Sequence, residues 1–150
     1  MAEVGNMKVC VAGAGAIGCT VAARLALAGV PVNVFARGAT LSSIKKTGIT
    51  LTDLDGEHHV VVNASDNANE FGVQDIVFVC TKAQAVSQIL PGIQPMIGPD
   101  TVVVPMVNGV PWWYFHGAGG RFEGRSVIAL DPNEELARNL PLKHVVGGVV

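Results

Sequence analysis

The sequence has little charge and few aromatic side chains. Charged residues make up 15% of its 150 residues, aromatic residues make up 5%, and the formal net charge is −2 at pH 7. No basic stripe is present, so the composition gives no electrostatic basis for binding nucleic acid. What the chain does have is a hydrophobic fraction of 49% and 18 glycines. This mixture favours a buried parallel sheet covered by helices over an antiparallel fold with one wet face.

Metal-ligand spacing and long apolar runs are also missing. The three cysteines, Cys10, Cys19 and Cys80, are too scattered to predict a metal site. We expect them to be unpaired in a reducing compartment, with Cys10 and Cys80 buried as small apolar side chains. Four glycines and one proline interrupt the apolar stretch over residues 9–36, which excludes a continuous membrane span. These features predict a cytoplasmic protein with no membrane partner.

Apolar runs alternate with helical patterns along most of the chain. After a disordered lead-in over residues 1–7, the patterns predict one domain over residues 8–150. The expected strands are 8–12, 32–36, 75–81, 101–105 and 144–150, with a hairpin of 49–54 and 58–63; the expected helices are 16–28, 40–47, 83–90 and 132–139, and a glycine-rich loop covers 117–125. This alternation predicts an α/β fold, a Rossmann-type, doubly wound, mainly parallel sheet with helices on both faces.

A glycine motif, Gly13-Ala14-Gly15-Ala16-Ile17-Gly18, directly follows the first expected strand and opens the first helix. In this setting the first glycine permits a tight turn, the second lets the backbone approach a pyrophosphate, and the third lets helix and strand pack closely. The helix start would then offer N–H groups and a positive dipole end to the anion. The six residues are therefore predicted to bind a dinucleotide. The alternative is a glycine-rich helix start without a ligand.

The end of the second expected strand bears on which dinucleotide binds. NAD-preferring domains place an acidic residue there to accept a hydrogen bond from the ribose 2′-hydroxyl. This chain has Phe35-Ala36-Arg37-Gly38 instead, with no acid. A guanidinium binds a 2′-phosphate by charge-assisted hydrogen bonds, so Arg37 favours NADP(H), with Thr40 as a second candidate contact. The alternative is a solvated surface arginine.

Two further motifs, Thr81-Lys82-Ala83 and Asn108-Gly109, complete a pattern that resembles the ketopantoate reductases (2-dehydropantoate 2-reductases). The resemblance runs over residues 8–150 and covers the N-terminal domain of that family only. It implies an NADP-dependent oxidoreductase that reduces a 2-oxo acid, and the first candidate reaction is that of 2-dehydropantoate to pantoate in pantothenate biosynthesis. The oligomeric state is open, with a homodimer as one possibility. Family members carry a second, helical domain with the catalytic lysine. The resemblance thus implies no catalytic residue in this chain, which we expect to be inactive alone.

The resemblance also gives roles to Lys82 and Asn108. It places both at the cofactor and the substrate, where an ammonium would attract a 2-oxo acid and an amide would hydrogen-bond to both ligands. The alternatives are a surface lysine after a strand and an ordinary Asn-Gly turn. The family usually has a glutamine three residues after this lysine; here that position is Ala85, and Gln84 comes one residue earlier.

The segment Val110-Pro111-Trp112-Trp113-Tyr114-Phe115 departs from the commoner glycine-rich continuation of the family. Its aromatic residues are expected either to wall the substrate cleft or to pack against the second domain. This departure leaves another 2-oxo acid open as the substrate. Two further alternatives remain, namely an NADP(H)-binding sensor, regulatory module or inactive remnant without turnover, and another NADP-dependent dehydrogenase of similar architecture.

Overall fold

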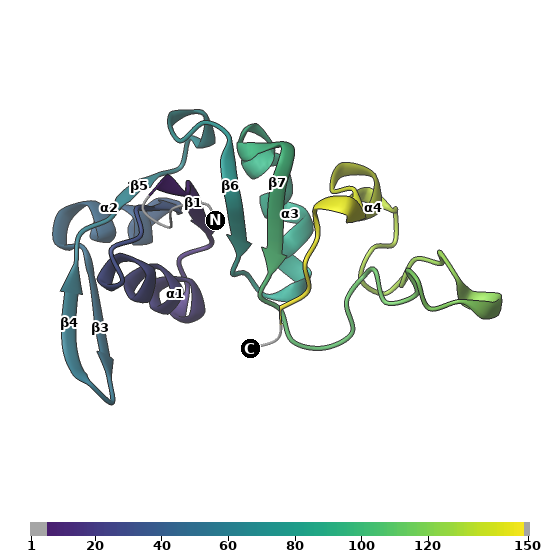
Figure 1. The fold of residues 1–150 in the computed structure, drawn as a ribbon, viewed down its shortest axis with the longest axis horizontal. Coiled ribbons are helices and arrows are strands. Elements are labelled where there is room, and N and C mark those ends of the chain that lie inside the picture. The colour runs from purple at the N-terminus through teal and green to yellow at the C-terminus, as the bar shows by residue number, and fades with distance from the viewer. Residues whose placement is uncertain (1–5, 149–150) are drawn as a thin grey trace.

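A five-stranded parallel sheet forms the centre of the domain. The computed structural model describes residues 6–148. The strands of the sheet are β1 (Val9–Ala12), β2 (Val32–Phe35), β5 (Asn63–Ser65), β6 (Gln74–Val79) and β7 (Ile97–Pro105). Their order is β5-β2-β1-β6-β7, so the chain moves outward from β1 on one side and then returns to build the other side (Figure 1). This is the doubly wound arrangement, and the predicted fold class is confirmed.

Helices cover both faces of this sheet. They are α1 (Ala16–Leu27), α2 (Gly38–Thr47), α3 (Val86–Ile93) and α4 (Glu135–Asn139), with short 3-10 turns at Ala68–Glu70, Ala83–Ala85, Gln94–Met96, Gly120–Phe122 and Leu142–His144. Successive residues of β1 alternate between two cores: Val9 and Val11 pack with α1 and α2, whereas Cys10 and Ala12 pack with α3 and α4. Because both faces are buried, β1 consists entirely of apolar residues, as a central parallel strand requires.

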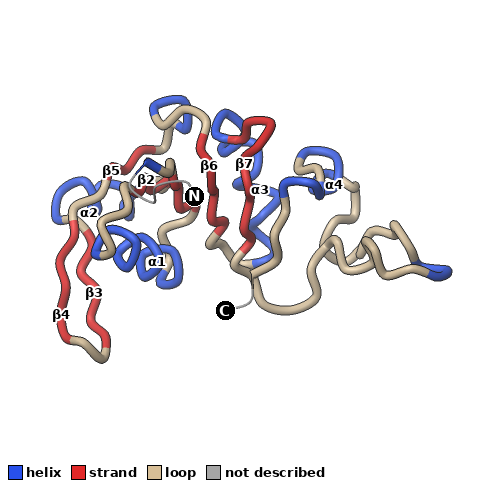
Figure 2. The backbone as a smooth tube through the Cα atoms, viewed as in Figure 1, coloured by secondary structure: helices blue, strands red, loops and turns tan. Residues whose placement is uncertain are grey.

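The predicted hairpin is present beside the main sheet. Strands β3 (Ile49–Asp53) and β4 (Gly56–Val60) pair antiparallel and project away from the sheet (Figure 2). The turn between them consists of Leu54 and Asp55, and β4 begins at Gly56, two residues before the predicted start at residue 58. An ion pair of 2.6 Å between Arg24 and Asp53 attaches the hairpin to α1. The second strand ends at Val60 rather than at residue 63, because Asn63 already belongs to β5 and pairs with β2. The sequence patterns did not predict β5.

The helix predicted over residues 83–90 differs at both ends. It starts as the 3-10 turn Ala83–Ala85, and α3 then continues through Pro91 to Ile93. A proline inside a helix removes one backbone hydrogen bond. The apolar face of α3 offsets this loss, because Val86, Ile89, Leu90 and Ile93 are all buried in the core.

The helix predicted over residues 132–139 is shorter than expected. It begins only at Glu135, after Glu134 in a left-handed conformation (φ 55°). The buried carboxylate of Asp131 accepts hydrogen bonds from the backbone N–H groups of Leu136 (3.1 Å) and Ala137 (3.0 Å). Asp131 therefore satisfies the donors at the start of the helix from outside its first turn.

The strand predicted over residues 144–150 is wrong for the described part of that range. A 3-10 turn ends at His144, and only two isolated parallel bridges follow, Val103 with Val145 and Met106 with Gly148. Residues 149–150 lie outside the described residues. The ring Nδ1 of His144 lies 2.9 Å from the carbonyl oxygen of Thr101 and so occupies a backbone acceptor of β7. Two adjacent glycines, 147 and 148, further weaken the strand.

The cysteines behave as the sequence predicts. Cys10, Cys19 and Cys80 are free, and Cys10 and Cys80 are buried. Burial raises the pKa of the Cys10 thiol to about 12 and that of the Cys80 thiol to about 11. Both side chains therefore stay protonated and apolar at neutral pH.

The structure also bears on the amino-terminal residues, on metal ligands and on membrane-spanning helices. Of the predicted lead-in over residues 1–7, residues 1–5 lie outside the described residues, and Met7 packs against the core. Within residues 6–148 the structure contains no group of three or more histidine, cysteine, aspartate or glutamate side chains arranged to hold a metal ion. Over the same residues no helix has the length and apolar character needed to cross a membrane.

Residues 114–128, which we term the arm, extend from the domain between β7 and α4 (Figures 1 and 2). As predicted, residues 117–125 are irregular, with one 3-10 turn. Glu123 closes this loop, because its carboxylate accepts hydrogen bonds from the backbone N–H groups of Gly117 and Gly119. The rings of Phe115 and Phe122 stack with centroids 5.5 Å apart.

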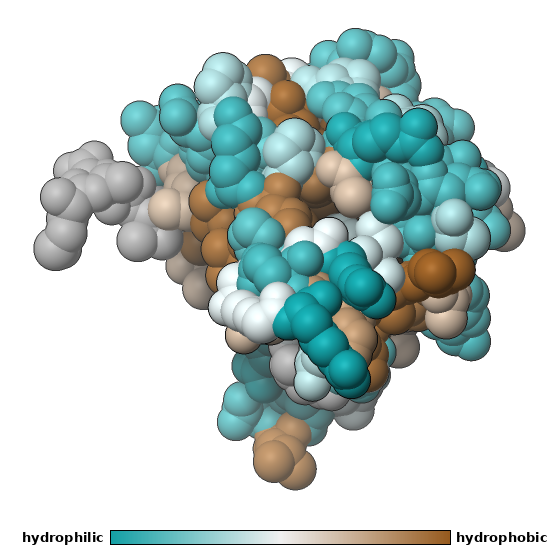
Figure 3. Space-filling model, turned by 90° about the vertical axis from the view of Figure 1, so that its right-hand side faces the viewer, coloured by the Kyte–Doolittle hydropathy of each residue, from teal (hydrophilic) through white to brown (hydrophobic). Residues whose placement is uncertain are grey.

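Figure 3 shows the surface on the right-hand side of Figure 1. Hydrophilic side chains cover much of this surface, with apolar areas between them.

Candidate dinucleotide site

The register of the sheet brings four strand ends to one edge. Ala12 of β1 stands opposite Phe35 of β2 and opposite Val79 of β6, and Val79 stands opposite Pro105 of β7. The segments that follow these four strands therefore emerge side by side at the carboxyl edge of the sheet. They contain the glycine motif, Arg37, Lys82 and Asn108. In doubly wound folds this edge, at the point where the strand order reverses, is where ligands bind.

The three motif glycines meet three different surroundings. Gly13 has φ +101°, and a Cβ atom there would lie 2.8 Å from Cγ2 of Thr81 and 3.0 Å from the carbonyl oxygen of Cys80. A Cβ on Gly18 would lie only 1.9 Å from the carbonyl oxygen of Gly13. A Cβ on Gly15, in contrast, would meet no atom of the described residues within 4 Å. Gly13 and Gly18 thus permit the turn and its packing, and Gly15 leaves an open space above the turn.

Two pockets meet above this turn. The larger, of about 600 Å³, is lined by Gly13, Gly15, Ala16, Ile17, Cys80, Thr81, Lys82, Ala83, Gln84, Met106, Val107 and Asn108. The smaller, of about 370 Å³, is lined by Gly13, Ala14, Gly15, Phe35, Ala36, Arg37, Thr40, Thr81 and Ile89. The structure therefore gathers all predicted site residues except Gly18 around these pockets, with Arg37 in one and Lys82 and Asn108 in the other. Gly18 lines neither pocket and acts through packing.

The chemistry of the groups around these pockets suits an anionic ligand such as a dinucleotide. Helix α1 begins at Ala16, and neither a side-chain cap from the N-cap residue Gly15 nor an acidic residue in the first turn compensates its positive end, which faces the pockets. Beside it, Oγ1 of Thr81 is buried and has no hydrogen-bond partner within residues 6–148. The exposed guanidinium of Arg37 adds a positive charge at the smaller pocket. An anionic ligand would satisfy the helix end and the guanidinium directly, and the Thr81 hydroxyl after rotation about its Cα–Cβ bond.

The aromatic segment does not line either pocket. Trp112 is buried in the core of this same domain, with α3 and α4, and its ring meets that of Trp113 edge-on at 4.2 Å. Neither sequence expectation for this segment, a wall of the substrate cleft or a contact with the second domain, holds for Trp112. Tyr114 is 56% exposed and does not line the pockets.

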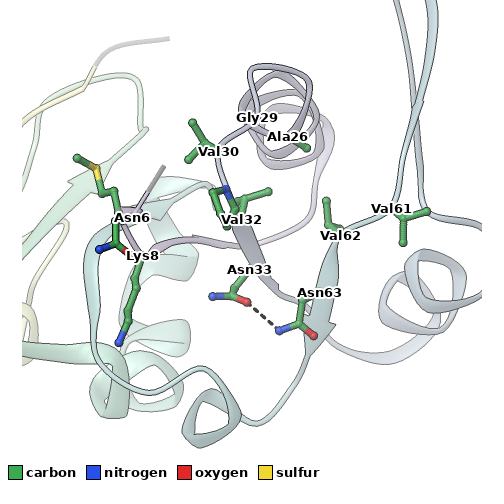
Figure 4. A pocket seen from close by; sticks show the side chains of 12 residues that line it. Asn6, Lys8, Ala26, Gly29, Val30, Val32, Asn33, Val61, Val62 and Asn63 are labelled. Atoms are coloured by element: carbon green, nitrogen blue, oxygen red, sulfur yellow. Dashed lines mark hydrogen bonds between the residues drawn. The ribbon is translucent and has the colours of Figure 1, made fainter. Parts of the chain in front are cut away.

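A third pocket, of about 610 Å³, lies at the opposite edge of the sheet (Figure 4). Its lining comes from the amino ends of β1, β2 and β5 and includes Lys8, Asn33 and Asn63. The Asn63 side chain donates a hydrogen bond of 2.8 Å to Oδ1 of Asn33, and Nδ2 of Asn33 donates one of 3.1 Å to Oε1 of the buried Gln74. These amides link β2 to its neighbour β5 and to β6 on the other side of β1, and the pocket is remote from the glycine turn.

Sequence reasoning missed several residues of the candidate site. Thr81 was read only as part of a family motif, and Met106 and Val107 were not singled out, although all three line the larger pocket. A usable signal was present for each of them, because each follows a core strand that ends at the ligand-binding edge.

Comparison with known proteins agrees with this arrangement. Residues 9–111 match the family described as Ketopantoate reductase PanE/ApbA. A 2-dehydropantoate 2-reductase of Mesorhizobium japonicum is 44% identical over 146 residues, which are 96% of this chain and 44% of that protein. The uncharacterized oxidoreductase YkpB of Bacillus subtilis is 30% identical over 103 residues, 69% of this chain and 34% of that protein. The chain thus spans less than half the length of these relatives.

Solved structures give the same result for the fold. A candidate ketopantoate reductase from Ralstonia solanacearum MolK2 superposes with a TM-score of 0.90 at 44% identity, covering 96% of this chain and 44% of that one. A PanE/ApbA family ketopantoate reductase from Ralstonia eutropha JMP134 superposes with a TM-score of 0.67 at 26% identity, covering 95% and 40%.

Proposed function

The chain belongs to the ketopantoate reductase PanE/ApbA family, and from that premise we propose that it binds NADP(H) as the cofactor-binding half of a 2-oxo acid reductase. The reaction proposed first is the reduction of 2-dehydropantoate to pantoate. One observation supports this most strongly: the two pockets meet at the glycine turn, with Arg37 at one and Lys82 and Asn108 at the other. A dinucleotide has the same layout, with an adenosine end, a pyrophosphate and a nicotinamide end.

The residues at the nicotinamide end suit a 2-oxo acid. When bound, NADPH supplies the hydride for the keto carbon. The ammonium of Lys82 attracts the carboxylate of the substrate, and the amide of Asn108 is placed to orient cofactor and substrate at the same edge. The proton for the new hydroxyl is expected from a lysine outside this chain, as the family resemblance implies.

Two measurements on the purified chain test this function. Fluorescence titration with NADPH and with NADH should give the tighter binding for NADPH, because only NADPH carries the 2′-phosphate; equal affinities would contradict the cofactor assignment. In the second measurement, the chain alone should oxidise NADPH with 2-dehydropantoate at a negligible rate, since we expect the general acid to be a lysine outside residues 1–150. Substantial turnover would place the general acid within residues 1–150.

A further inference from the structure

Thr81 stands where the two pockets join. Only Gly13, Gly15 and Thr81 line both of them, and of these three residues Thr81 alone has a side chain. A dinucleotide joins its two nucleosides through the pyrophosphate, so a dinucleotide that fills both pockets carries its pyrophosphate past these residues. The side chain at this crossing is a secondary alcohol, which can donate one hydrogen bond.

The hydroxyl group of Thr81 is unpaired among the described residues. Its oxygen is buried and makes no hydrogen bond to any residue from 6 to 148, while its methyl carbon packs towards Gly13. A buried hydroxyl without a partner is unfavourable, and native proteins seldom keep one without a reason. Rotation about the Cα–Cβ bond moves the oxygen between staggered positions, so the side chain can turn it towards the pockets.

We propose that the hydroxyl of Thr81 donates a hydrogen bond to the pyrophosphate of the bound dinucleotide. This inference rests on the proposed function and adds a cofactor-binding residue to it. Backbone N–H groups at the start of α1 approach the same anion from the other side of the turn. Among the residues that line both pockets, Thr81 is then the one whose side chain binds the pyrophosphate. Arg37 binds one end of the cofactor, and Lys82 contacts the other end.

The test compares Thr81→Val, which replaces the hydroxyl by a methyl group of similar size, with Thr81→Ser, which keeps it. Thr52→Val is the matched control, because Thr52 is an exposed threonine on β3, outside both pockets. Each variant is titrated with NADP⁺ and with adenosine 2′-monophosphate by isothermal calorimetry. The second probe reaches the Arg37 pocket but has no pyrophosphate.

Loss of a hydrogen bond to a charged group predicts that Thr81→Val binds NADP⁺ about ten- to a hundredfold more weakly. Its affinity for adenosine 2′-monophosphate should be unchanged, and Thr81→Ser and Thr52→Val should bind both probes within about threefold of wild type. Thermal unfolding without ligand should show Thr81→Val at least as stable as wild type, because the unpaired hydroxyl is gone. If Thr81→Val does not fold, Thr81→Ala replaces it in the titrations.

Results that contradict this inference differ from results that contradict the proposed function. Unchanged NADP⁺ affinity in a folded Thr81→Val or Thr81→Ala variant would overturn this inference and leave the proposed function standing. Equal weakening of both probes would also overturn it, because the side chain would then shape the adenosine pocket. A wild-type chain that bound neither NADP(H) nor NAD(H) would overturn the proposed function and this inference together.

Discussion

The methyl carbon of Thr81 lies 2.8 Å from the position that a Cβ atom on Gly13 would occupy. This contact joins the turn after β1 to the end of β6, at the point where the order of the sheet reverses. It explains why the first glycine of the motif cannot carry a side chain. The space above Gly15, in contrast, is open, so the second glycine leaves room that the protein itself does not fill.

The contrast between these glycines predicts two different phenotypes. Gly13→Ala should lower the free energy of unfolding by about 1–3 kcal/mol, because the new methyl group meets Thr81 and the backbone has positive φ. Gly15→Ala should change it by less than about 1 kcal/mol, since φ is −78° and no atom is close. The same Gly15→Ala chain should bind NADP(H) at least about tenfold more weakly, because the methyl group occupies the space for the pyrophosphate. Chemical denaturation and NADPH titration of both variants test this; two variants with the same phenotype would contradict it.

Arg37 should decide between the two nicotinamide cofactors. Arg37→Ala should weaken NADPH binding by about ten- to a hundredfold through loss of charge-assisted hydrogen bonds, and should leave NADH binding within about twofold. The wild-type preference should also shrink at high salt, because the guanidinium is exposed. Arg121→Ala is the matched control, since it removes the same charge from the arm. Parallel loss of NADPH and NADH affinity in Arg37→Ala would mean that Arg37 does not recognise the 2′-phosphate.

The loop of the arm should respond to acid through one carboxyl group. Hydrogen bonds from the backbone N–H groups of Gly119 and Gly117 hold the pKa of Glu123 below its usual range. A carboxyl group with a lowered folded-state pKa contributes stability above its unfolded pKa, and that contribution is lost as the pH falls through the folded pKa. The amide resonances of Gly117 and Gly119 should therefore keep their neutral-pH positions through the pH range in which an ordinary glutamate titrates, and should move together only below that range.

The variant Glu123→Gln provides the comparison for this pH titration. At neutral pH its Gly117 and Gly119 resonances should already resemble those of the acidified wild-type chain, whereas Glu57→Gln on β4 should leave them unchanged. An amide titration with its midpoint in the ordinary glutamate range would show that these hydrogen bonds do not form in solution.

The sequence predicts those elements whose conformation is set by residues close together in the chain. The glycine motif directly after an apolar strand specifies a turn and a helix start, because positive φ and close packing are needed within six residues. The Asp55-Gly56 pair specifies its hairpin in the same way. The missing acid after the second strand, with Arg37 in its place, is likewise visible in the sequence. These features were sufficient to predict the Rossmann-type fold and, among the residues that line the two pockets, those of the glycine motif and Arg37.

The remaining features depend on contacts between distant segments. Strand β5 is only three residues long and exists because β2 offers it a free edge. Residues 144–148 do not form a continuous strand, because the His144 ring occupies a backbone acceptor of β7, 43 residues away. Trp112 lies in the core because α3 and α4 present an apolar surface to it.

The sequence by itself determined the fold class, the glycine turn and the residues at the strand ends, because strand, turn and helix signals act within a few residues. Only the tertiary structure decided that Thr81 lies between the two pockets with its hydroxyl unpaired. That position follows from the parallel register of β1 and β6, which brings Gly13 and Thr81 together across 68 residues of chain. No local pattern specifies such a register, because it is set by the packing of both faces of the sheet.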